Sequence, residues 1–397
     1  MISRFFAAFL LIAALLPAVL PITARAELRV TGRVRTNPTL RYQGIPEQSE
    51  LSRAVGGFLK ACGWFDVVDD GRSDYEIIGS SSGGQCRIEL RAGGAALGAW
   101  MVPVNVPPRQ AAKLVVDTIL QKLFNLSGIC QTRIAFCADV AKGIKEIYSC
   151  DIDGGDLQQV TFFNTLCVEP CFFPDGNSIG YTKYGNSVTD VVQTRFAPKL
   201  QSRLLTSFPG LNVGVSVSPD SSRMALILSP DHQVDLYAKP VGDGPLRRLT
   251  RDRAVEASPC WSPDGRQICF VSDASGRPQI YAINADGSGR RRLPSVGSEA
   301  VTPDWSDDNQ IVYATKVGGA YTLAVLDLKT GENLRATNVS GTWESPAWGP
   351  DNRQVVCKRS DGPRASLFIV DTWTGKVRQL LATRNALSMP CWSKAKK

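Results

Sequence analysis

The sequence predicts a multi-domain protein that joins α+β and all-β structure: a small N-terminal α/β domain, then a six-bladed β-propeller closed by the C-terminal strand. Three observations predict this fold. A bulky residue followed by a turn recurs every 43 to 45 residues in the later part of the chain. Short runs rich in Ile, Val, Phe and Tyr lie between these copies. The first 130 residues follow a different pattern, with two amphipathic helical stretches.

One copy of the repeat, Ser262–Leu293, shows the unit most clearly. It holds two β-type runs, Gln267–Ser272 and Gln279–Asn284, and a Pro-Asp-Gly turn precedes the first run. Pro presets the backbone of a turn, Asp tolerates its strained positions and Gly lets the chain leave it, so this string predicts a hairpin turn. With Trp261 on a preceding strand, the copy predicts four antiparallel strands. Such a unit cannot bury both of its faces alone, so it must be repeated.

The repeats predict six propeller blades. Aligned on the bulky anchor residue, the copies lie 45, 44, 44, 43 and 44 residues apart by subtraction, at Phe172, Val217, Trp261, Trp305, Trp348 and Trp392. Repeats of about 40–50 residues with several short strands are typical of propeller blades.

The two ends of the repeat region predict how the ring closes. Arg133–Cys137 and Glu146–Asp151 match the second and third strands of a blade, but no anchor strand precedes them. Met389–Ser393 is an anchor strand with no blade after it. We therefore expect the C-terminal strand to complete the first blade, so that the propeller covers residues 133–393 and has no free sheet ends.

The first 26 residues predict a cleavable secretory signal. Arg4 precedes an apolar run, Phe5–Leu20, and the segment ends in Ala-Arg-Ala, so cleavage is expected between Ala26 and Glu27. The run is too short for a spanning helix, which needs about twenty residues. No Cys stands at the cleavage site, so the sequence gives no support to a lipid-anchored form. The mature chain is expected in the periplasm, without direct insertion into a membrane.

Residues 27–130 predict a separate α/β domain. Two helices are expected from apolar residues at three-and-four spacing, and four strands from β-type runs between Gly, Ser and Asp turns. The helices are Glu47–Cys62 and Arg109–Phe124, and the strands are Trp64–Val68, Tyr75–Ile78, Gln85–Arg91 and Leu97–Val104.

Charge and cysteine content exclude several classes of function. The net charge of +8 falls to +6 once Arg4 and Arg25 are removed, which does not favour nucleic acid as a partner. The eleven cysteines include no C-x-x-C motif and no Cys/His cluster, so we predict no metal and no cofactor. Disulfides are compatible with an exported chain, but the odd count leaves one cysteine over and the sequence does not give the pairing. Cys171, Cys260 and Cys391 share one repeat position, where core packing is also expected.

One motif points to an enzyme, and its context argues against it. Residues 176–180 match G-x-S-x-G, but a nucleophile elbow needs a strand before it and a helix after it. Here Ser178 lies between a turn and a strand of the second blade, and His232, the one histidine of the chain, belongs to another loop. We predict no enzymatic activity. The alternative is a propeller that binds or hydrolyses a small ligand or peptide at its channel mouth. Four acidic loop residues could line one face and meet a partner, a cation or only solvent: Glu169, Glu256, Glu299 and Glu344.

The chain resembles the TolB family of the Tol-Pal system. The most specific string is Thr132-Arg133-Ile134-Ala135-Phe136, followed by Glu146-Ile147-Tyr148 and the Asp-Gly turn after it, which is similar to the family's domain junction and first blade. The Ser262–Leu293 repeat is similar to the family's blade repeat. The order of signal peptide, small α/β domain and six-bladed propeller also matches.

The resemblance implies a periplasmic interaction scaffold that links the peptidoglycan-associated lipoprotein Pal to the inner-membrane protein TolA. That role supports outer-membrane integrity and envelope constriction during cell division, and a monomer is expected. Pal-facing loops would be Ser207–Gly214 and Arg251–Ser258, with Phe162–Glu169, Ser295–Val301 and Ser340–Ser345 in the other blades. The implied Pal contacts are Leu211, Asn212, Gly214, Glu256 and Ala257. The implied TolA segment is Glu27–Arg33, beginning Glu27, Leu28, Arg29 and Val30. The chain has Leu211 where the family often has a histidine.

Overall fold

We describe a computed structural model of the chain over residues 28–29, 35–82, 85–103, 105–126, 128–185, 188–362 and 364–395. The predicted signal segment, the Ala26–Glu27 cleavage site and Val30 lie outside the described residues.

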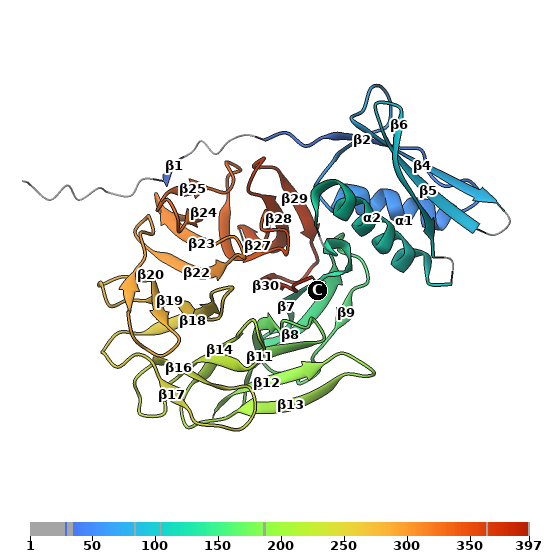
Figure 1. Cartoon of the computed structure of the whole chain (residues 1–397). Helices are drawn as coiled ribbons and strands as arrows, with labels where there is room; N and C mark the ends of the chain where they lie inside the picture. The colour runs from blue at the N-terminus through green and yellow to red at the C-terminus, as the bar shows by residue number, and fades with distance from the viewer. Residues whose placement is uncertain are drawn as a thin grey trace, which may run out of the picture.

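Six sheets, each with four antiparallel strands, are arranged around a central axis as the blades of a propeller, and β1 (Leu28–Arg29) adds a fifth, parallel strand to one of them (Figure 1). We number the blades from 1 to 6 by their innermost strands, which are β30 (Leu387–Trp392), β10 (Cys167–Phe172), β14 (Asn212–Val217), β18 (Glu256–Trp261), β22 (Ala300–Trp305) and β26 (Thr342–Trp348). The second strands are β7 (Arg133–Ala141), β11 (Ser178–Tyr184), β15 (Arg223–Leu228), β19 (Gln267–Ser272), β23 (Gln310–Val317) and β27 (Gln354–Asp361). The third strands are β8 (Ile144–Asp151), β12 (Thr189–Arg195), β16 (Asp235–Pro240), β20 (Gln279–Asn284), β24 (Ala320–Asp327) and β28 (Arg364–Asp371). The outer strands are β9 (Gln158–Gln159), β13 (Gln201–Thr206), β17 (Arg247–Arg248), β21 (Arg291–Arg292), β25 (Asn333–Arg335) and β29 (Val377–Leu381).

The predicted closure of the ring is confirmed. Strand β30 pairs with β7 in an antiparallel register that sets Trp392 opposite Ile134, so the C-terminal strand is the innermost strand of blade 1. The backbone N–H of Ser393 donates to the carbonyl oxygen of Arg133 at 2.9 Å and extends the pairing by one residue. The indole N–H of Trp392 donates to the Thr132 hydroxyl at 2.8 Å. The chain therefore ends beside the point at which the propeller begins (Figure 1).

The predicted anchor residues hold neighbouring blades together. Each one is the last residue of an innermost strand, and none is more than 9% exposed. The indole N–H of Trp261 donates to the carbonyl oxygen of Ser216 in the preceding blade at 3.1 Å. The indole of Trp348 donates in the same way to Asp304, also at 3.1 Å. A large apolar ring thus fills the space between two sheets while its polar edge finds a buried acceptor.

The Pro-Asp turns gather on one face of the propeller, which we call the turn face. In blade 4 the Ser262 hydroxyl donates to Asp264 at 2.6 Å and accepts the backbone N–H of Gln267 at 2.9 Å. Gly265 completes this turn with a φ of +67°, a left-handed conformation that favours glycine. Because every innermost strand runs toward these turns, the loops that lead into the innermost strands lie on the opposite face, which we call the loop face.

Residues 35–124 form a five-stranded sheet with two helices on one side (Figure 1). The strand order is β3-β2-β4-β5-β6, and the pairs of β2 with β3 and with β4 are parallel. The elements are β2 (Thr39–Tyr42), α1 (Ser49–Ala61), β3 (Asp66–Val68), β4 (Tyr75–Ser82), β5 (Gln85–Ala92), β6 (Ala95–Val102) and α2 (Pro108–Phe124), and a short 3-10 turn, Ile129–Gln131, leads into the propeller. Strand β2 was not predicted from the sequence because it has only four residues, next to Pro38.

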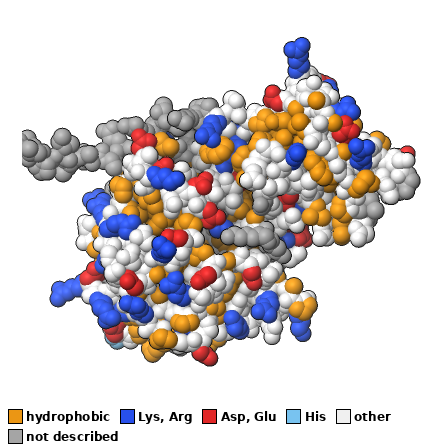
Figure 2. All heavy atoms as spheres, viewed as in Figure 1, with side chains coloured by type: hydrophobic (Ala, Val, Ile, Leu, Met, Phe, Trp, Pro, Cys, Tyr) orange, Lys and Arg blue, Asp and Glu red, His pale blue; other side chains and the backbone are white. Residues whose placement is uncertain are grey.

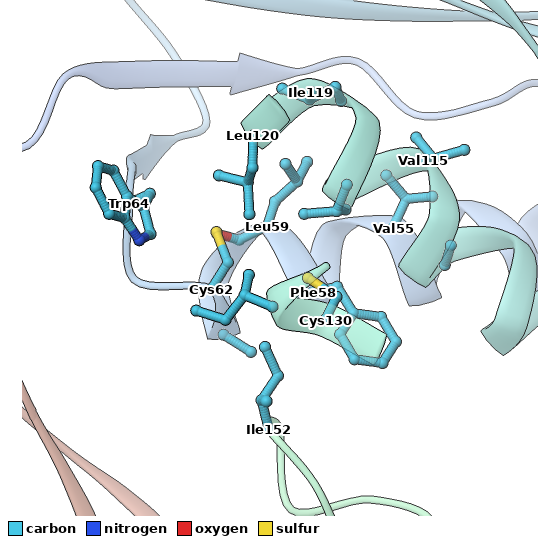
Figure 3. Close-up of a cluster of buried hydrophobic side chains, with 14 of the residues drawn as sticks. Val55, Phe58, Leu59, Cys62, Trp64, Val115, Ile119, Leu120, Cys130 and Ile152 are labelled. Atoms are coloured by element: carbon cyan, nitrogen blue, oxygen red, sulfur yellow. The ribbon is translucent and has the colours of Figure 1, made fainter. Parts of the chain in front are cut away.

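The helices pack against the propeller and share a core with it. Ile152, from the turn after β8, reaches the buried side chains of α1 and α2, among them Phe58 and Leu59 (Figure 3). The side-chain amide of Gln354 donates to the carbonyl oxygen of Cys62 at 2.7 Å, and the Trp64 indole donates to Asp351 at 3.0 Å. The N-terminal domain therefore covers the turn face of blades 1 and 6 and leaves the loop face open.

Candidate functional site

The loop face carries most of the exposed large apolar side chains of the described residues. Thirteen such side chains are exposed, and eight of them lie in loops or strand ends on this face. These eight come from five of the six blades and are Val140, Phe162, Phe163, Tyr184, Val188, Val255, Val317 and Val339. Exposed apolar side chains that gather on one face of a protein mark an interaction site. We therefore take the loop face as the candidate functional site.

The most exposed aromatic residue on this face belongs to a rigid loop. Phe162 is 63% exposed, although the loop around it is tied down by a buried carboxylate. Glu146, which is 1% exposed, accepts the Thr161 hydroxyl and also the backbone N–H of Asn164 at 2.6 Å. The Thr161 hydroxyl in turn accepts the backbone N–H of Ile147 at 2.8 Å. A partner that meets Phe162 would thus meet a pre-ordered surface, with little loop entropy to lose on binding.

A cavity of about 1150 Å³ runs along the propeller axis and opens toward the turn face, because its lining extends from the innermost strands to the Pro-Asp turns and to Asn125 and Leu126. Its wall is built from the same position in all six innermost strands, where the pairing register shifts and one residue has a positive φ of 48° to 65°. These six residues are Glu169, Gly214, Ser258, Thr302, Ser345 and Met389. Bulges of this kind bend a strand and re-aim its side chains. The sequence repeat did not reveal them, because only one of the six is glycine.

Glu169 at the channel wall connects two blades. Its carboxylate accepts the backbone N–H of Gly214 in blade 3 at 3.0 Å and the Thr182 hydroxyl of its own blade at 3.1 Å. Burial raises the pKa of this carboxyl above its ordinary value, although both hydrogen bonds act in the opposite direction. The residue therefore links blades 2 and 3 at the channel wall.

Of the five predicted Pal contacts, the structure buries three. Asn212 is 0% exposed. Its side-chain NH2 donates to the carbonyl oxygen of Phe208 at 2.7 Å, and its side-chain oxygen accepts the backbone N–H of Phe208 at 2.8 Å. Gly214 lines the channel wall, and Glu256 is 1% exposed. Leu211 and Ala257 are partly exposed beside them. All five belong to the loop face. The buried Asn212 and Glu256 stabilise its loops, and the partly exposed Leu211 and Ala257 lie at its surface.

Glu256 is an unusual buried carboxylate. One of its oxygens accepts the guanidinium of Arg290 at 3.1 Å, while the other has no hydrogen-bond partner. Arg290 also pairs with Asp252 and donates to the Ser272 hydroxyl at 2.8 Å, so its charge is shared. Burial raises the pKa of Glu256 to about 7. The carboxyl can therefore gain or lose its proton near neutral pH.

The other acidic loop residues are held by neighbours. Glu299 accepts the ammonium group of Lys316 at 2.9 Å and also the Tyr321 hydroxyl. Glu344 accepts the ammonium group of Lys358 at 2.7 Å. Among the described residues, no group of three or more His, Cys, Asp or Glu side chains is arranged to hold a metal ion.

The predicted TolA segment is described at two residues. Leu28 and Arg29 form β1, which runs parallel to the outer strand of blade 5, with Leu28 opposite Asn333 (Figure 1). Further along, the backbone N–H of Arg35 donates to the carbonyl oxygen of Trp373 at 3.4 Å, and its guanidinium lies 4.3 Å from the centre of that ring. Leu28 and Arg29 thus lie on the outer strand of blade 5, and Arg35 contacts blade 6 where the N-terminal domain begins. Glu27 and Val30 lie outside the described residues.

Ser178 of the G-x-S-x-G match lies at the start of β11 and is 2% exposed. Its hydroxyl accepts the side-chain amide of Gln193 at 2.8 Å. His232 is in a turn of blade 3, with a φ of +69°. The motif therefore occupies a turn-to-strand position in a sheet, and the strand–turn–helix context of a nucleophile elbow is not found there.

Charge is distributed evenly over the side of the molecule seen in Figure 2. Lys and Arg side chains are interspersed with Asp and Glu over the blades. Across the described residues, no helix is long and apolar enough to cross a membrane.

Comparison with known proteins gives one consistent result. The sequence model of the TolB beta propeller domain family matches residues 120–396. The chain is 29% identical over 377 residues to the Tol-Pal system protein TolB of Bordetella pertussis, which covers 93% of this chain and 83% of that protein. A TolB homolog of Chlorobium luteolum is 32% identical over 188 residues, which is 40% of each chain. The crystal structure of TolB from Acinetobacter baumannii matches the fold with a TM-score of 0.81 and 21% identity, over 93% of this chain and 100% of that one.

Proposed function

The chain belongs to the TolB β-propeller family, and from this membership we propose that it is a periplasmic scaffold of a Tol-Pal system. In this role it links a Pal-type peptidoglycan-associated lipoprotein to a TolA-type inner-membrane protein, and so supports outer-membrane integrity and envelope constriction during division. The observation that carries the proposal is the loop face, which bears eight exposed apolar side chains and lies opposite the N-terminal domain.

The loop face is the binding surface for the Pal-type partner. Propeller loops are held by a rigid scaffold, so a partner meets a fixed arrangement of side chains. Leu211 and Ala257 contribute directly, while Asn212, Gly214 and Glu256 keep the loops in shape. An apolar centre with charged residues around it is the usual anatomy of a specific protein interface.

The start of the mature chain, Glu27–Arg33, is the segment that engages the TolA-type partner. In the described structure Leu28 and Arg29 pair with β25, so the same backbone groups cannot bind a partner at that time. A partner on the loop face that favours release of this arm would increase the population able to bind TolA. The two partners are thereby coupled through one propeller.

The function needs no catalysis by this chain. The alternative, a propeller that binds or hydrolyses a small ligand or peptide at the channel mouth, would need an accessible nucleophile. Ser178 is buried and hydrogen-bonded to Gln193, which does not favour that alternative.

Binding measurements with separate partners test the proposal. The mature chain is immobilised, and purified Pal-type and TolA-type proteins from the same organism are passed over it. Both are expected to bind, and deletion of Glu27–Arg33 should abolish TolA binding while Pal binding stays measurable. If TolA binds the deletion variant with unchanged affinity, the role of the arm is wrong. If neither partner binds the intact chain, while peptides or esters are turned over and Ser178→Ala stops turnover, the alternative function is correct.

A further inference from the structure

Two cysteines lie directly opposite each other on the two inner strands of blade 4. The register of β18 and β19 sets Cys260 opposite Cys269. Both side chains point to the same side of the sheet, because both belong to the buried cluster between blades 4 and 5 that contains Trp305 and Ile311. The structure carries both residues as thiols.

The Cα spacing at this pair lies within the range of disulfides. Two residues further along the strands, the backbone N–H of Ser262 donates to the carbonyl oxygen of Gln267 at 2.9 Å, which marks that pair as hydrogen-bonded. Because the pattern alternates along an antiparallel ladder, Cys260 and Cys269 are a hydrogen-bonded pair too, with Cα atoms about 5.5 Å apart. Disulfides most often join Cα atoms about 5.5–6 Å apart.

The other blades show that this pair is specific to blade 4. Cys171 and Cys391 occupy the same repeat position as Cys260, yet the residues opposite them are Gly180 and Ala135. Only Cys260 of these three therefore has a second thiol across the strand. Cys171 and Cys391 serve as matched controls, because they share the strand position and the channel wall with Cys260.

We propose that Cys260 and Cys269 are an oxidation site, joined by a disulfide in the mature protein, which fastens the innermost strand of blade 4 to its neighbour beside the channel. The proposal rests on the periplasmic location proposed above, since an oxidising compartment supplies the electron acceptor. The bond would hold the bulge at Ser258 and the loop-face segment Arg251–Ala257 against β19.

The reaction is a thiol–disulfide exchange with a disulfide donor such as oxidised glutathione or an oxidised dithiol protein. One cysteine thiolate attacks the donor disulfide, forms a mixed disulfide and expels one donor thiolate. The second cysteine thiolate then attacks the protein sulfur of the mixed disulfide, so that the Cys260–Cys269 bond forms and the second donor thiolate leaves. The two cysteines lose two protons and two electrons in total, and the donor gains them.

The surroundings of the two thiols in the folded protein predict when the disulfide forms. Cys269 is 0% exposed and Cys260 is 8% exposed, so a donor cannot reach them easily in the closed blade. The neighbouring Cys269 thiol and burial raise the pKa of Cys260 well above its ordinary value, which leaves little thiolate in the folded protein. We therefore expect the bond to form while the chain folds and to form slowly once reduced protein has folded.

Peptide mapping tests the proposal, because Arg266 separates the two cysteines. Tryptic cleavage places Cys260 in residues 254–266 and Cys269 in residues 267–290, and neither peptide holds another cysteine. The full chain is exported in a bacterial host, blocked with iodoacetamide under denaturing conditions without reductant, and digested. The expected result is one linked pair of these two peptides, lighter by two hydrogen atoms than the sum of the free peptides. The pair should persist in Cys171→Ser and Cys391→Ser, and be absent in Cys260→Ser and Cys269→Ser.

A second experiment distinguishes a failure of the disulfide proposal from a failure of the proposed periplasmic location. Reduced, denatured wild-type protein is refolded with and without oxidised glutathione and mapped in the same way. The linked pair in the refolded protein, but not in the exported preparation, would contradict the location and support the bond. The bond should also raise the melting temperature by about 5 °C over reduced wild type, with no such rise in Cys269→Ser. Two fully alkylated peptides in both preparations, or a link from Cys260 to another cysteine, would overturn the proposal.

Discussion

Arg353 is the residue on which the junction between the N-terminal domain and the propeller depends most. Its side chain is 3% exposed and lies between two tryptophan rings, 4.6 Å from the centre of Trp64 and 4.9 Å from the centre of Trp373. It donates to Asp371 through Nε at 3.0 Å and also donates to Asn37. A flat, always-charged guanidinium suits this position because it stacks on two rings and pairs with a carboxylate in one plane.

Removing this side chain should destabilise the protein strongly. Arg353→Ala leaves the Asp371 carboxylate without its buried partner, so we expect the free energy of unfolding to fall by about 3–5 kcal/mol. The matched control is Arg359→Ala in β27 of the same blade, six residues further along the chain. Arg359 also stacks on an aromatic ring, 5.2 Å from the centre of Trp343, but its acidic partner Asp361 is 64% exposed, and a loss of about 1 kcal/mol or less is expected. Urea unfolding curves measure both, and equal losses would contradict this assignment.

Glu256 gives the protein a pH dependence near neutrality. Its ordinary pKa of 4.5 is raised to about 7 in the folded state, so the folded protein holds the proton more tightly than the unfolded chain. The resulting stabilisation is fully present below about pH 4.5 and is lost as the pH rises through about 7. As the pH rises from about 4.5 to about 7, the free energy of unfolding of wild type should fall by about 3 kcal/mol more than that of Glu256→Gln, whose side chain cannot titrate.

Urea unfolding at several pH values between 5 and 8 checks this expectation. The stability difference between wild type and Glu256→Gln should move steadily in favour of the variant as the pH rises. A difference that stays constant over this range would show that the Glu256 carboxyl does not titrate between the folded and unfolded states as described.

At the scale of elements, strand β30 decides whether the ring is closed. Trp392→Ala removes a ring that is 6% exposed and its hydrogen bond to Thr132, so we expect a loss of about 3–5 kcal/mol. Deletion of residues 394–397 is the control, since the described contact of Lys394 is an exposed ion pair with Asp307 at 3.1 Å, worth about 1 kcal/mol or less. Thermal unfolding followed by circular dichroism measures both. Unchanged melting of Trp392→Ala would mean that the C-terminal strand does not hold the ring together.

The blades could be predicted from the sequence because each carries its own complete signal. Each blade repeats its turn residues, β-type runs and anchor residue at one spacing. Even the divergent copy, which has Val217 as its anchor, keeps the Pro-Asp turn. Helices α1 and α2 were predicted to within two residues at each end by their apolar spacing. Strand β2 could not be predicted, because in four residues the alternation of apolar and polar side chains is too short to distinguish a strand from a loop.

The candidate site was predictable only as a set of loops. Which of its side chains are exposed depends on tertiary contacts that a single sequence does not show: Phe162 is 63% exposed, while Phe173, in another loop of similar composition, is 5% exposed. Glu256 and Asn212 were predicted as contacts from the family resemblance, and the structure buries both of them. The role of Arg353 cannot be read from the sequence, because its aromatic partners come from two different domains.

At the scale of the whole molecule, the two faces of the propeller have different roles. The turn face of blades 1 and 6 is covered by the N-terminal domain through a shared core, and the loop face remains open. Leu28 and Arg29 pair with the outer strand of blade 5, and the Arg35 guanidinium stacks on Trp373. Under the proposed function, a partner on the open face and a partner on the segment Glu27–Arg33 bind the same molecule at separate places.

One pair of substitutions tests this division most directly. Phe162 and Leu157 are both exposed apolar residues, 63% and 49% exposed, and they lie on opposite faces within five residues of each other. Affinity for the Pal-type lipoprotein is measured by calorimetry for wild type, Phe162→Asp and Leu157→Asp. We predict that Phe162→Asp weakens binding by about tenfold or more, because it replaces an exposed aromatic side chain of the proposed binding surface with a charge, while Leu157→Asp changes it by less than about twofold. Equal effects, or a loss confined to Leu157→Asp, would contradict the loop face as the partner surface.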